Sequence, residues 1–172
     1  EALKELTNPK TFNISDRRLG VSTSGVIPGI RRMTEEVPFV RLAFSLHSPF
    51  HDQRNELVPL NKRFPFNEVL EVLDEHVAKT KRQVFLAYLV LNGVNDSPDH
   101  INELIKIVKG RGKHSYLYIV NLLRYNPAFG VGETYPKTSE ETLIAIKQQL
   151  GRAGILATIR QSFGKDIDAA CG

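Results

Sequence analysis

The sequence predicts an α/β fold made of β/α units around a parallel sheet. Short apolar segments, rich in β-branched and aromatic residues, alternate with segments whose apolar residues recur at helical spacing. The chain of 172 residues is 41% hydrophobic and 24% charged, which is typical of a globular domain with a substantial core. Four strands and a short fifth can be identified, too few for a closed eight-unit barrel.

Five segments are predicted to be strands, at residues 17–23, 39–46, 84–91, 116–123 and 155–159. The second, from Phe39 to Leu46, is almost uninterrupted in its apolar character, so we expect both of its faces to be covered. The third ends at the turn signal Asn92-Gly93. Right-handed crossovers would join these strands into one parallel sheet.

Helices are predicted from apolar spacing and from end signals. One runs over residues 2–6 and another over 67–79, and Pro28-Gly29 marks a turn or a short helical start. Ser97-Pro98 is the N-terminal signal of a third helix. Thr138, followed three residues later by Glu141, predicts a capping box that opens the last helix.

Small polar side chains and one imidazole follow the predicted strands. Ser22 and Ser24 lie at the end of the first strand, Ser45 and His47 at the end of the second, and Asn126 just past the fourth. The serines could merely satisfy local backbone groups, His47 could bridge buried carbonyls, and Asn126-Pro127 could be an ordinary turn. Because the carboxyl ends of parallel strands meet at one edge, they could instead converge on the ribose and amino-acid end of a nucleoside cofactor.

The last nine residues contain Cys171, the single cysteine of the chain. A lone thiol forms no disulfide within the chain, so it is either a small buried apolar group or a reactive nucleophile on a loop. Asp166 and Asp168 nearby are either an acid/base pair or loop-anchoring charges. One cysteine fits a reducing compartment, and we expect the protein in the cytoplasm.

Several classes of function lack support. No apolar run approaches the ~20 residues of a membrane helix and no signal-peptide pattern opens the sequence, so no membrane partner is expected. The histidines show no ligand spacing, so no metal site is predicted, and His76 and His100 fall in helical stretches expected to face solvent. P-loop, dinucleotide-binding and nucleophile-elbow motifs are absent from the sequence.

Charge leaves a nucleic-acid partner open. The formal net charge is +4, which permits RNA binding without requiring it. Basic residues cluster at residues 17–18, 31–32, 62–63, 79–82 and 106–113. Each cluster is either an RNA contact or a solvated helix face, and charge alone does not decide between them.

Four stretches, taken in order, resemble motifs of the radical-SAM methyltransferases that modify an adenosine in 23S rRNA. They are Val21-Ser22-Thr23-Ser24-Gly25, Phe44-Ser45-Leu46-His47-Ser48-Pro49, Asn121-Leu122-Leu123-Arg124-Tyr125-Asn126-Pro127 and Ser162-Phe163-Gly164-Lys165-Asp166-Ile167-Asp168-Ala169-Ala170-Cys171-Gly172. Four matched stretches spread over the whole chain are far more specific than any one of them.

This resemblance implies the C-terminal portion of a partial (β/α)6 TIM-like barrel, which in the family holds a [4Fe–4S] cluster and S-adenosylmethionine (SAM) at its mouth. By motif position, the residues that would contact SAM are Ser22, Ser45, Leu46, His47 and Asn126. Cys171 would be methylated by one SAM, and a second SAM, cleaved with an electron from a donor, would start the transfer to adenine. The implied partners are 23S rRNA and that electron donor.

Within the family, the sequence resembles the chloramphenicol–florfenicol resistance (Cfr-type) branch, which methylates carbon-8 of the adenine. The shared stretches are residues 12–18, 45–49, 73–76 and 123–127. Housekeeping members methylate carbon-2, have tRNA as a possible second target, and usually carry proline where Arg124 stands. The expected function is therefore carbon-8 methylation in the peptidyl-transferase region, with resistance to several ribosome-targeting antibiotics, and carbon-2 methylation is the alternative.

One departure from the family is large. The three cluster cysteines, the second catalytic cysteine and the Gly-Glu-Pro motif are missing, and one cysteine cannot hold a cluster. We therefore expect the C-terminal half of such an enzyme, with residues 1–160 in the barrel, residues 161–172 as the cysteine loop, and the N-terminal half as its partner. The alternatives are a non-catalytic RNA-binding module and a conventional β/α-barrel enzyme acting on a phosphorylated metabolite.

Overall fold

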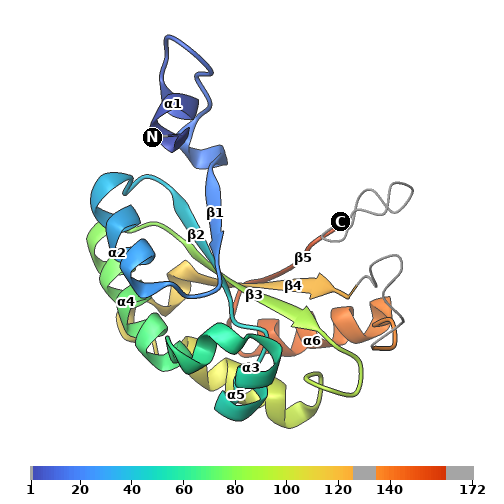
Figure 1. Cartoon of the computed structure of the whole chain (residues 1–172). Coiled ribbons are helices and arrows are strands. Elements are labelled where there is room, and N and C mark those ends of the chain that lie inside the picture. Colours follow the sequence, from blue (N-terminus) through green and yellow to red (C-terminus); the bar gives the residue numbers. More distant parts are fainter. Residues whose placement is uncertain (1, 126–134, 162–172) are drawn as a thin grey trace.

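Among the residues that the structure describes, five parallel strands form a curved sheet (Figure 1). The computed structural model describes residues 2–125 and 135–161. The strands are β1 (Gly20–Thr23), β2 (Arg41–Ser45), β3 (Val84–Val90), β4 (Tyr118–Arg124) and β5 (Ala157–Ile159). They lie side by side in sequence order, each parallel to the next. Sequential order is that of a β/α barrel, whereas a doubly wound sheet reverses its order at a switch point.

Helices connect the strands and cover one face of the sheet. They are α1 (Ala2–Thr7), α2 (Ile27–Glu36), α3 (His51–Leu57), α4 (Phe66–Thr80), α5 (Pro98–Lys109) and α6 (Glu140–Arg152), with 3-10 turns η1 (Asp16–Arg18), η2 (Pro59–Lys62) and η3 (Gly112–Leu117). Figure 1 shows α2, α4, α5 and α6 following the convex side of the curved sheet, while α1 extends beyond the start of β1.

The core lies between the sheet and these helices. It includes the fully buried Leu42, Phe44, Leu86, Tyr88 and Leu122 from strands and Val69, Leu73, Leu104, Leu143 and Leu150 from helices. Side chains alternate between buried and half-buried along β2 and β3. The expectation that residues 39–46 would be covered on both faces is therefore wrong, because the helices cover only one face and leave Ala43 and Ser45 half-exposed.

Element boundaries differ from the sequence prediction where short 3-10 turns intervene. η1 occupies the start of the predicted first strand and η3 the start of the predicted fourth, so β1 begins at Gly20 and β4 at Tyr118. Helix α2 is longer than the short start predicted at Pro28-Gly29, and α3 was not predicted because its sequence, HDQRNEL, has a single apolar residue.

The cap of α6 is one residue later than predicted. Ser139 is the N-cap, and its Oγ accepts a hydrogen bond from the backbone N–H of Thr142 at 3.1 Å. Thr138 is buried, and its hydroxyl donates to the carbonyl oxygen of Val90 at 2.7 Å. The hydroxyl of Thr138 thus satisfies the last carbonyl of β3 and is not available as a cap.

His76 does not face solvent as predicted. It is 1% exposed, because α4 packs against α2 as well as against the sheet. The hydroxyl of Thr34 on α2 donates to the carbonyl of Ile30 at 2.9 Å and lies 2.8 Å from Nδ1 of His76. This hydroxyl has one proton, so Nδ1–H of His76 is the donor to it.

Candidate functional site

The ends of β1 and β2 bring three of the predicted site residues to one edge of the sheet. Ser22 pairs in register with Ala43, two residues before Ser45, which ends β2. Ser22 is exposed and Ser45 is half-buried, so both are on the uncovered face of the sheet. His47 follows two residues after Ser45, where β2 leaves the sheet. These three residues therefore lie at or just past the carboxyl ends of two neighbouring strands, and their convergence on one ligand stays a prediction.

His47 is held in an unusual conformation by the neighbouring strand. Its φ angle is 57°, in the left-handed region that non-glycine residues seldom adopt. The backbone N–H of Leu89 donates to Nδ1 of the ring at 3.1 Å, and the His47 N–H donates to the carbonyl of Ala87 at 3.3 Å. Since Nδ1 accepts a hydrogen bond, the proton of the neutral ring is on Nε2.

The imidazole of His47 is a neutral hydrogen-bond donor near pH 7. Burial, and to a smaller degree the positive charge of Arg54, lower the pKa of His47 to about 4. Acid/base work at neutral pH needs a pKa near 7, so this ring is unsuited to it. It is suited to donating Nε2–H to an oxygen atom of a ligand.

Leu46 is placed differently from its neighbours. Its side chain is fully buried in the core, its N–H donates to Ala87, and its carbonyl accepts from Arg54. Its backbone groups are thus engaged within the protein, and a contact between Leu46 and a cofactor stays a prediction. Asn126 and Cys171, the other two predicted site residues, lie outside the described residues, as do Asp166 and Asp168.

Two buried polar residues that the sequence analysis missed support this edge. Asn95 is fully buried, and its side-chain amide donates to the carbonyls of His47 and Leu89, both at 2.7 Å. Its Oδ1 accepts from the N–H of Leu91 at 2.7 Å. Asn95 follows the Asn92-Gly93 turn, which was noted as a turn only, and no local pattern marks it as a buried residue.

Arg54 of α3 is the second residue that was missed. Its side chain is fully buried, and its guanidinium donates to the carbonyls of Ser24, Ser45 and Leu46 at 2.8–3.0 Å. A further hydrogen bond of 2.6 Å goes to Oδ1 of Asn61. Burial lowers the pKa of Arg54 to about 10, so it stays charged at neutral pH. The sequence around Arg54, HDQRNEL, is polar apart from its final leucine, so nothing in it distinguishes Arg54 from a solvent-exposed arginine.

The uncovered face of the sheet carries a row of small and polar residues beside this edge. The row consists of Ser45, Ala87, Asn121 and Thr158, which are paired in register across β2 to β5. The hydroxyl of Thr158 donates to Oδ1 of Asn121 at 3.1 Å. Such a row can bind a flat polar ligand by hydrogen bonds without steric obstruction.

The described residues contain no group of three or more His, Cys, Asp or Glu side chains that could hold a metal ion. The single cysteine of the sequence is Cys171. An iron–sulfur cluster needs several thiolate ligands, so the residues of this chain do not fit one.

Comparisons with known proteins add the family context. The chain is 49% identical over all of its 172 residues to the ribosomal RNA large subunit methyltransferase Cfr of Staphylococcus aureus, and 48% identical to Cfr of Bacillus velezensis. In both cases the match covers 49% of the relative. Over its whole length, the chain is homologous to part of the Cfr-type radical-SAM methyltransferases. It spans about half the length of the curated relatives it matches, and no family model matches it.

Solved structures confirm the predicted fold class. A radical SAM methyltransferase from Sphaerobacter thermophilus superposes with a TM-score of 0.88 at 39% identity, over 99% of this chain and 48% of the other. A domain of pyruvate-formate lyase-activating enzyme from Bacteroides vulgatus has a TM-score of 0.62 at 19% identity, which shows the fold alone. The chain therefore has the α/β fold of radical-SAM enzymes and corresponds to part of their partial barrel.

None of the helices in residues 2–125 and 135–161 is both long enough and apolar enough to cross a bilayer.

Proposed function

We propose that the protein containing this chain is a cytoplasmic radical-SAM methyltransferase that methylates carbon-8 of an adenosine in 23S rRNA. The modified adenosine would lie in the peptidyl-transferase region, where an added methyl group obstructs several ribosome-targeting antibiotics. The observation that carries the proposal is the 48–49% identity to Cfr proteins along the entire chain. It is supported by the position of Ser22, Ser45 and His47 at one edge of the sheet.

The side chains at this edge fit the polar parts of SAM. The hydroxyls of Ser22 and Ser45 can donate or accept hydrogen bonds, which suits ribose hydroxyls. His47 can only donate near pH 7, because its Nδ1 already accepts from Leu89. We assign it to an oxygen atom of SAM. Asn126 would complete this set, as its motif position suggests.

The iron–sulfur cluster requires residues from outside this sequence. One cysteine cannot supply the thiolates of a [4Fe–4S] cluster, and relatives at 48–49% identity are about twice as long. We propose that the other half of the enzyme holds the cluster, which would supply the electron for reductive cleavage of SAM after its own reduction by an electron donor. The proposed role of the present chain is to bind and orient SAM.

Cys171 is the proposed methyl carrier. Its thiolate would accept the methyl group of one SAM molecule, releasing S-adenosylhomocysteine, and the carbon would then pass to the adenine. A thiolate is the cysteine form that attacks such an electrophile. This role follows from the motif match of residues 162–172 and needs a direct test.

The test is mass spectrometry of the full-length enzyme after expression with iron, SAM and reductant. We expect one added methyl group on the peptide that contains Cys171, and none in a Cys171→Ala variant. An unmodified Cys171 in an enzyme that still methylates rRNA would remove the carrier role. Loss of methylation in Cys171→Ala, with the cluster intact, would support it.

Mapping of the modified adenosine then identifies the branch. A methyl group on carbon-8 would support the Cfr-type function, which is favoured by Arg124, the residue that stands where housekeeping enzymes usually carry proline. Arg124 ends β4 and contacts Glu140 at 3.4 Å. A methyl group on carbon-2 would assign the chain to the housekeeping branch instead.

A further inference from the structure

Arg54 is a buried cation, and the described residues include no carboxylate paired with it. Burying a charge without a counter-ion costs free energy, so a buried arginine of this kind needs other polar groups to solvate its charge. In Arg54 the charge is solvated by three backbone carbonyls and by the side-chain amide oxygen of Asn61. The guanidinium carbon also lies 4.8 Å from the ring centroid of Phe44. The charge is therefore solvated by the protein itself.

The three carbonyls belong to the two strand ends that carry the proposed SAM contacts. Ser24 follows β1, Ser45 is the last residue of β2, and Leu46 follows directly after it. The register of β1 with β2 stops at Thr23 and Phe44, so beyond this point the sheet no longer joins the two segments. Nη2 of Arg54 bonds to Ser24 and Ser45 at once, at 3.0 and 2.8 Å. One planar group thus continues the connection between the strands.

Asn61 fixes the orientation of this planar group. Asn61 is fully buried, and its Oδ1 accepts from Nη1 of Arg54 and from the backbone N–H of Phe66 at 2.9 Å. Its amide nitrogen donates to Oδ1 of Asn55 at 2.7 Å. The guanidinium is therefore tied to the first residue of α4, and its fork has little freedom to rotate.

We propose that Arg54 is a positioning residue for SAM binding, which holds the ends of β1 and β2 so that Ser22, Ser45 and His47 keep a fixed mutual geometry. The proposal rests on the proposed function, in which these three residues bind SAM. Arg54 itself does not reach the ligand, because its donors are directed at carbonyls inside the protein. Its effect passes through the backbone of the two strand ends.

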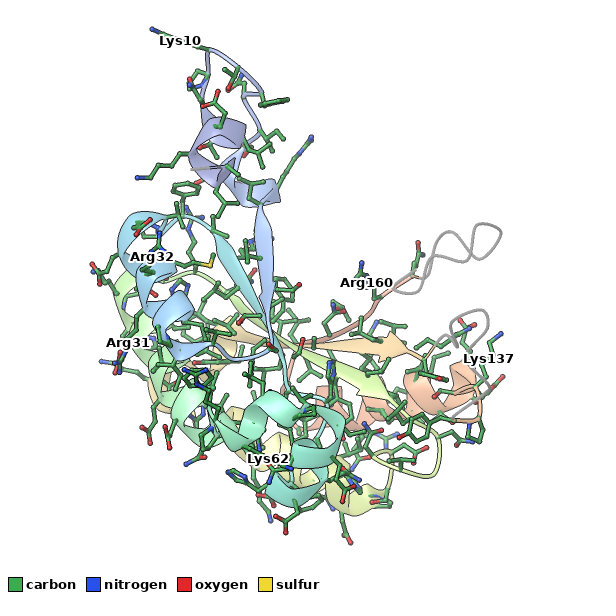
Figure 2. The ribbon with its side chains drawn as sticks, in the orientation of Figure 1. Lys10, Arg31, Arg32, Lys62, Lys137 and Arg160 are labelled. Atoms are coloured by element: carbon green, nitrogen blue, oxygen red, sulfur yellow. The ribbon has the colours of Figure 1, made fainter. Side chains whose placement is uncertain are left out.

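The test compares three variants of the full-length, cluster-loaded enzyme. Arg54→Met removes the charge and all four hydrogen bonds, and Arg54→Lys keeps the charge without the planar fork. Arg31→Met is the matched control, because Arg31 is on the outer side of α2 with a side chain 61% exposed (Figure 2). For each variant we would measure iron content, the melting temperature, and the dissociation constants of SAM and of an rRNA fragment.

A positioning role predicts a selective effect on SAM. We expect the SAM dissociation constant to rise about 10- to 100-fold in Arg54→Met and by a smaller factor in Arg54→Lys. The affinity for the rRNA fragment and the iron content should stay within about twofold of wild type in both Arg54 variants, and Arg31→Met should match wild type in SAM affinity, iron content and melting temperature. Selective loss of SAM affinity separates positioning from a general loss of structure.

Several results would overturn the proposal. One is a folded Arg54→Lys enzyme whose SAM dissociation constant stays within about twofold of wild type. Another is a parallel fall of SAM affinity, RNA affinity and iron content in both variants, or failure of both to fold, which would make Arg54 a purely structural residue. If the wild-type enzyme binds no SAM, the proposed function fails, and the positioning role fails with it. Failure of the proposed function can be told apart from failure of the positioning role alone, because it is seen in the wild-type enzyme without any variant.

Discussion

Individual polar residues inside this protein serve the backbone of the strand ends. Arg54 solvates three carbonyls, and Asn95 pairs with the backbone of His47 and Leu89. These backbone groups lie near the carboxyl ends of β1, β2 and β3, where the pairing between neighbouring strands stops on at least one side, and buried groups of this kind need a partner. Asn95 thus holds the carbonyl of His47, whose φ angle is 57°, while the N–H of Leu89 holds its ring. The hydrogen bonds that satisfy these buried backbone groups therefore also shape the proposed site.

His76 predicts how stability depends on pH. Its Nε2 is buried without a hydrogen-bond partner among the described residues, so a second proton on the ring would have no acceptor. Burial lowers the pKa of His76 from 6.5 to about 4. Between pH 4 and 6.5 the unfolded chain therefore binds more protons than the folded one. The contribution of neutral His76 to the free energy of unfolding is fully present above pH 6.5 and is lost as the pH falls toward 4.

The shift of His76 corresponds to a loss of at most about 3 kcal/mol across that window. Urea unfolding of the cluster-free, full-length protein at pH 7.5 and pH 5 would measure it, with His76→Gln as the control. Glutamine can still bond to Thr34 but does not titrate, so the variant should lose less stability than wild type between the two pH values. Equal losses in both proteins would assign the pH dependence to other groups.

At the scale of elements, the turn from β1 into α2 depends on Gly25. Its φ angle is +111°, which side chains other than hydrogen rarely allow. An added Cβ would lie 3.0 Å from both Phe44 and Val69, so it would press against β2 and α4. The motif from Val21 to Gly25 therefore has a structural reason for its last residue, independent of any cofactor.

Gly25→Ala should destabilise the protein by about 2 kcal/mol or more, since backbone strain adds to overpacking. Gly29→Ala is a matched control, because Gly29 is inside α2 and an added Cβ would approach nothing closer than 3.7 Å. There the change should be neutral or stabilising by up to about 1 kcal/mol. Denaturant unfolding of both variants measures the difference, and similar stability of the two would refute the role assigned to Gly25.

At the scale of the whole molecule, helices cover one face of the sheet and leave the other with half-exposed residues. Parallel sheets are normally covered on both faces, and in a barrel the second face is the interior. The uncovered face carries the polar row from Ser45 to Thr158. We therefore propose that the cofactor binds on this uncovered face, which in a barrel would be the interior.

The proposed RNA partner leads to a prediction at this scale. Lys10, Lys62, Lys137 and Arg160 are exposed and spread over different elements, as Figure 2 shows, so we expect RNA binding to rest on distributed phosphate contacts. Affinity of the full-length enzyme for an rRNA fragment should fall at least about tenfold between about 50 and about 200 mM salt. Cys171→Ala should leave this affinity within about twofold while it abolishes methylation.

Filter-binding titrations at several salt concentrations, with parallel methylation assays, would check both parts. Binding that does not respond to salt would contradict a phosphate-based interface. Methylation that survives Cys171→Ala would contradict the carrier role without affecting the interface.

Local sequence patterns determined the order of strands and helices, the Ser97 cap of α5, and the placement of Ser22, Ser45 and His47 at strand ends. These features follow from periodicity, from capping chemistry and from the rule that parallel strands end at a common edge. The motifs also led to the Cfr-type family. The boundaries of β1 and β4, and the missed helix α3, show where short-range signals were too weak.

Only the tertiary structure decided which polar residues are buried. Arg54 reaches Ser24 across 30 positions of sequence, and Asn95 reaches His47 across 48. His76 is buried because α2 packs over α4, which the periodicity of α4 alone does not reveal. Burial of a charged or polar side chain depends on partners brought together by the fold, so no local pattern in the sequence could have identified Arg54.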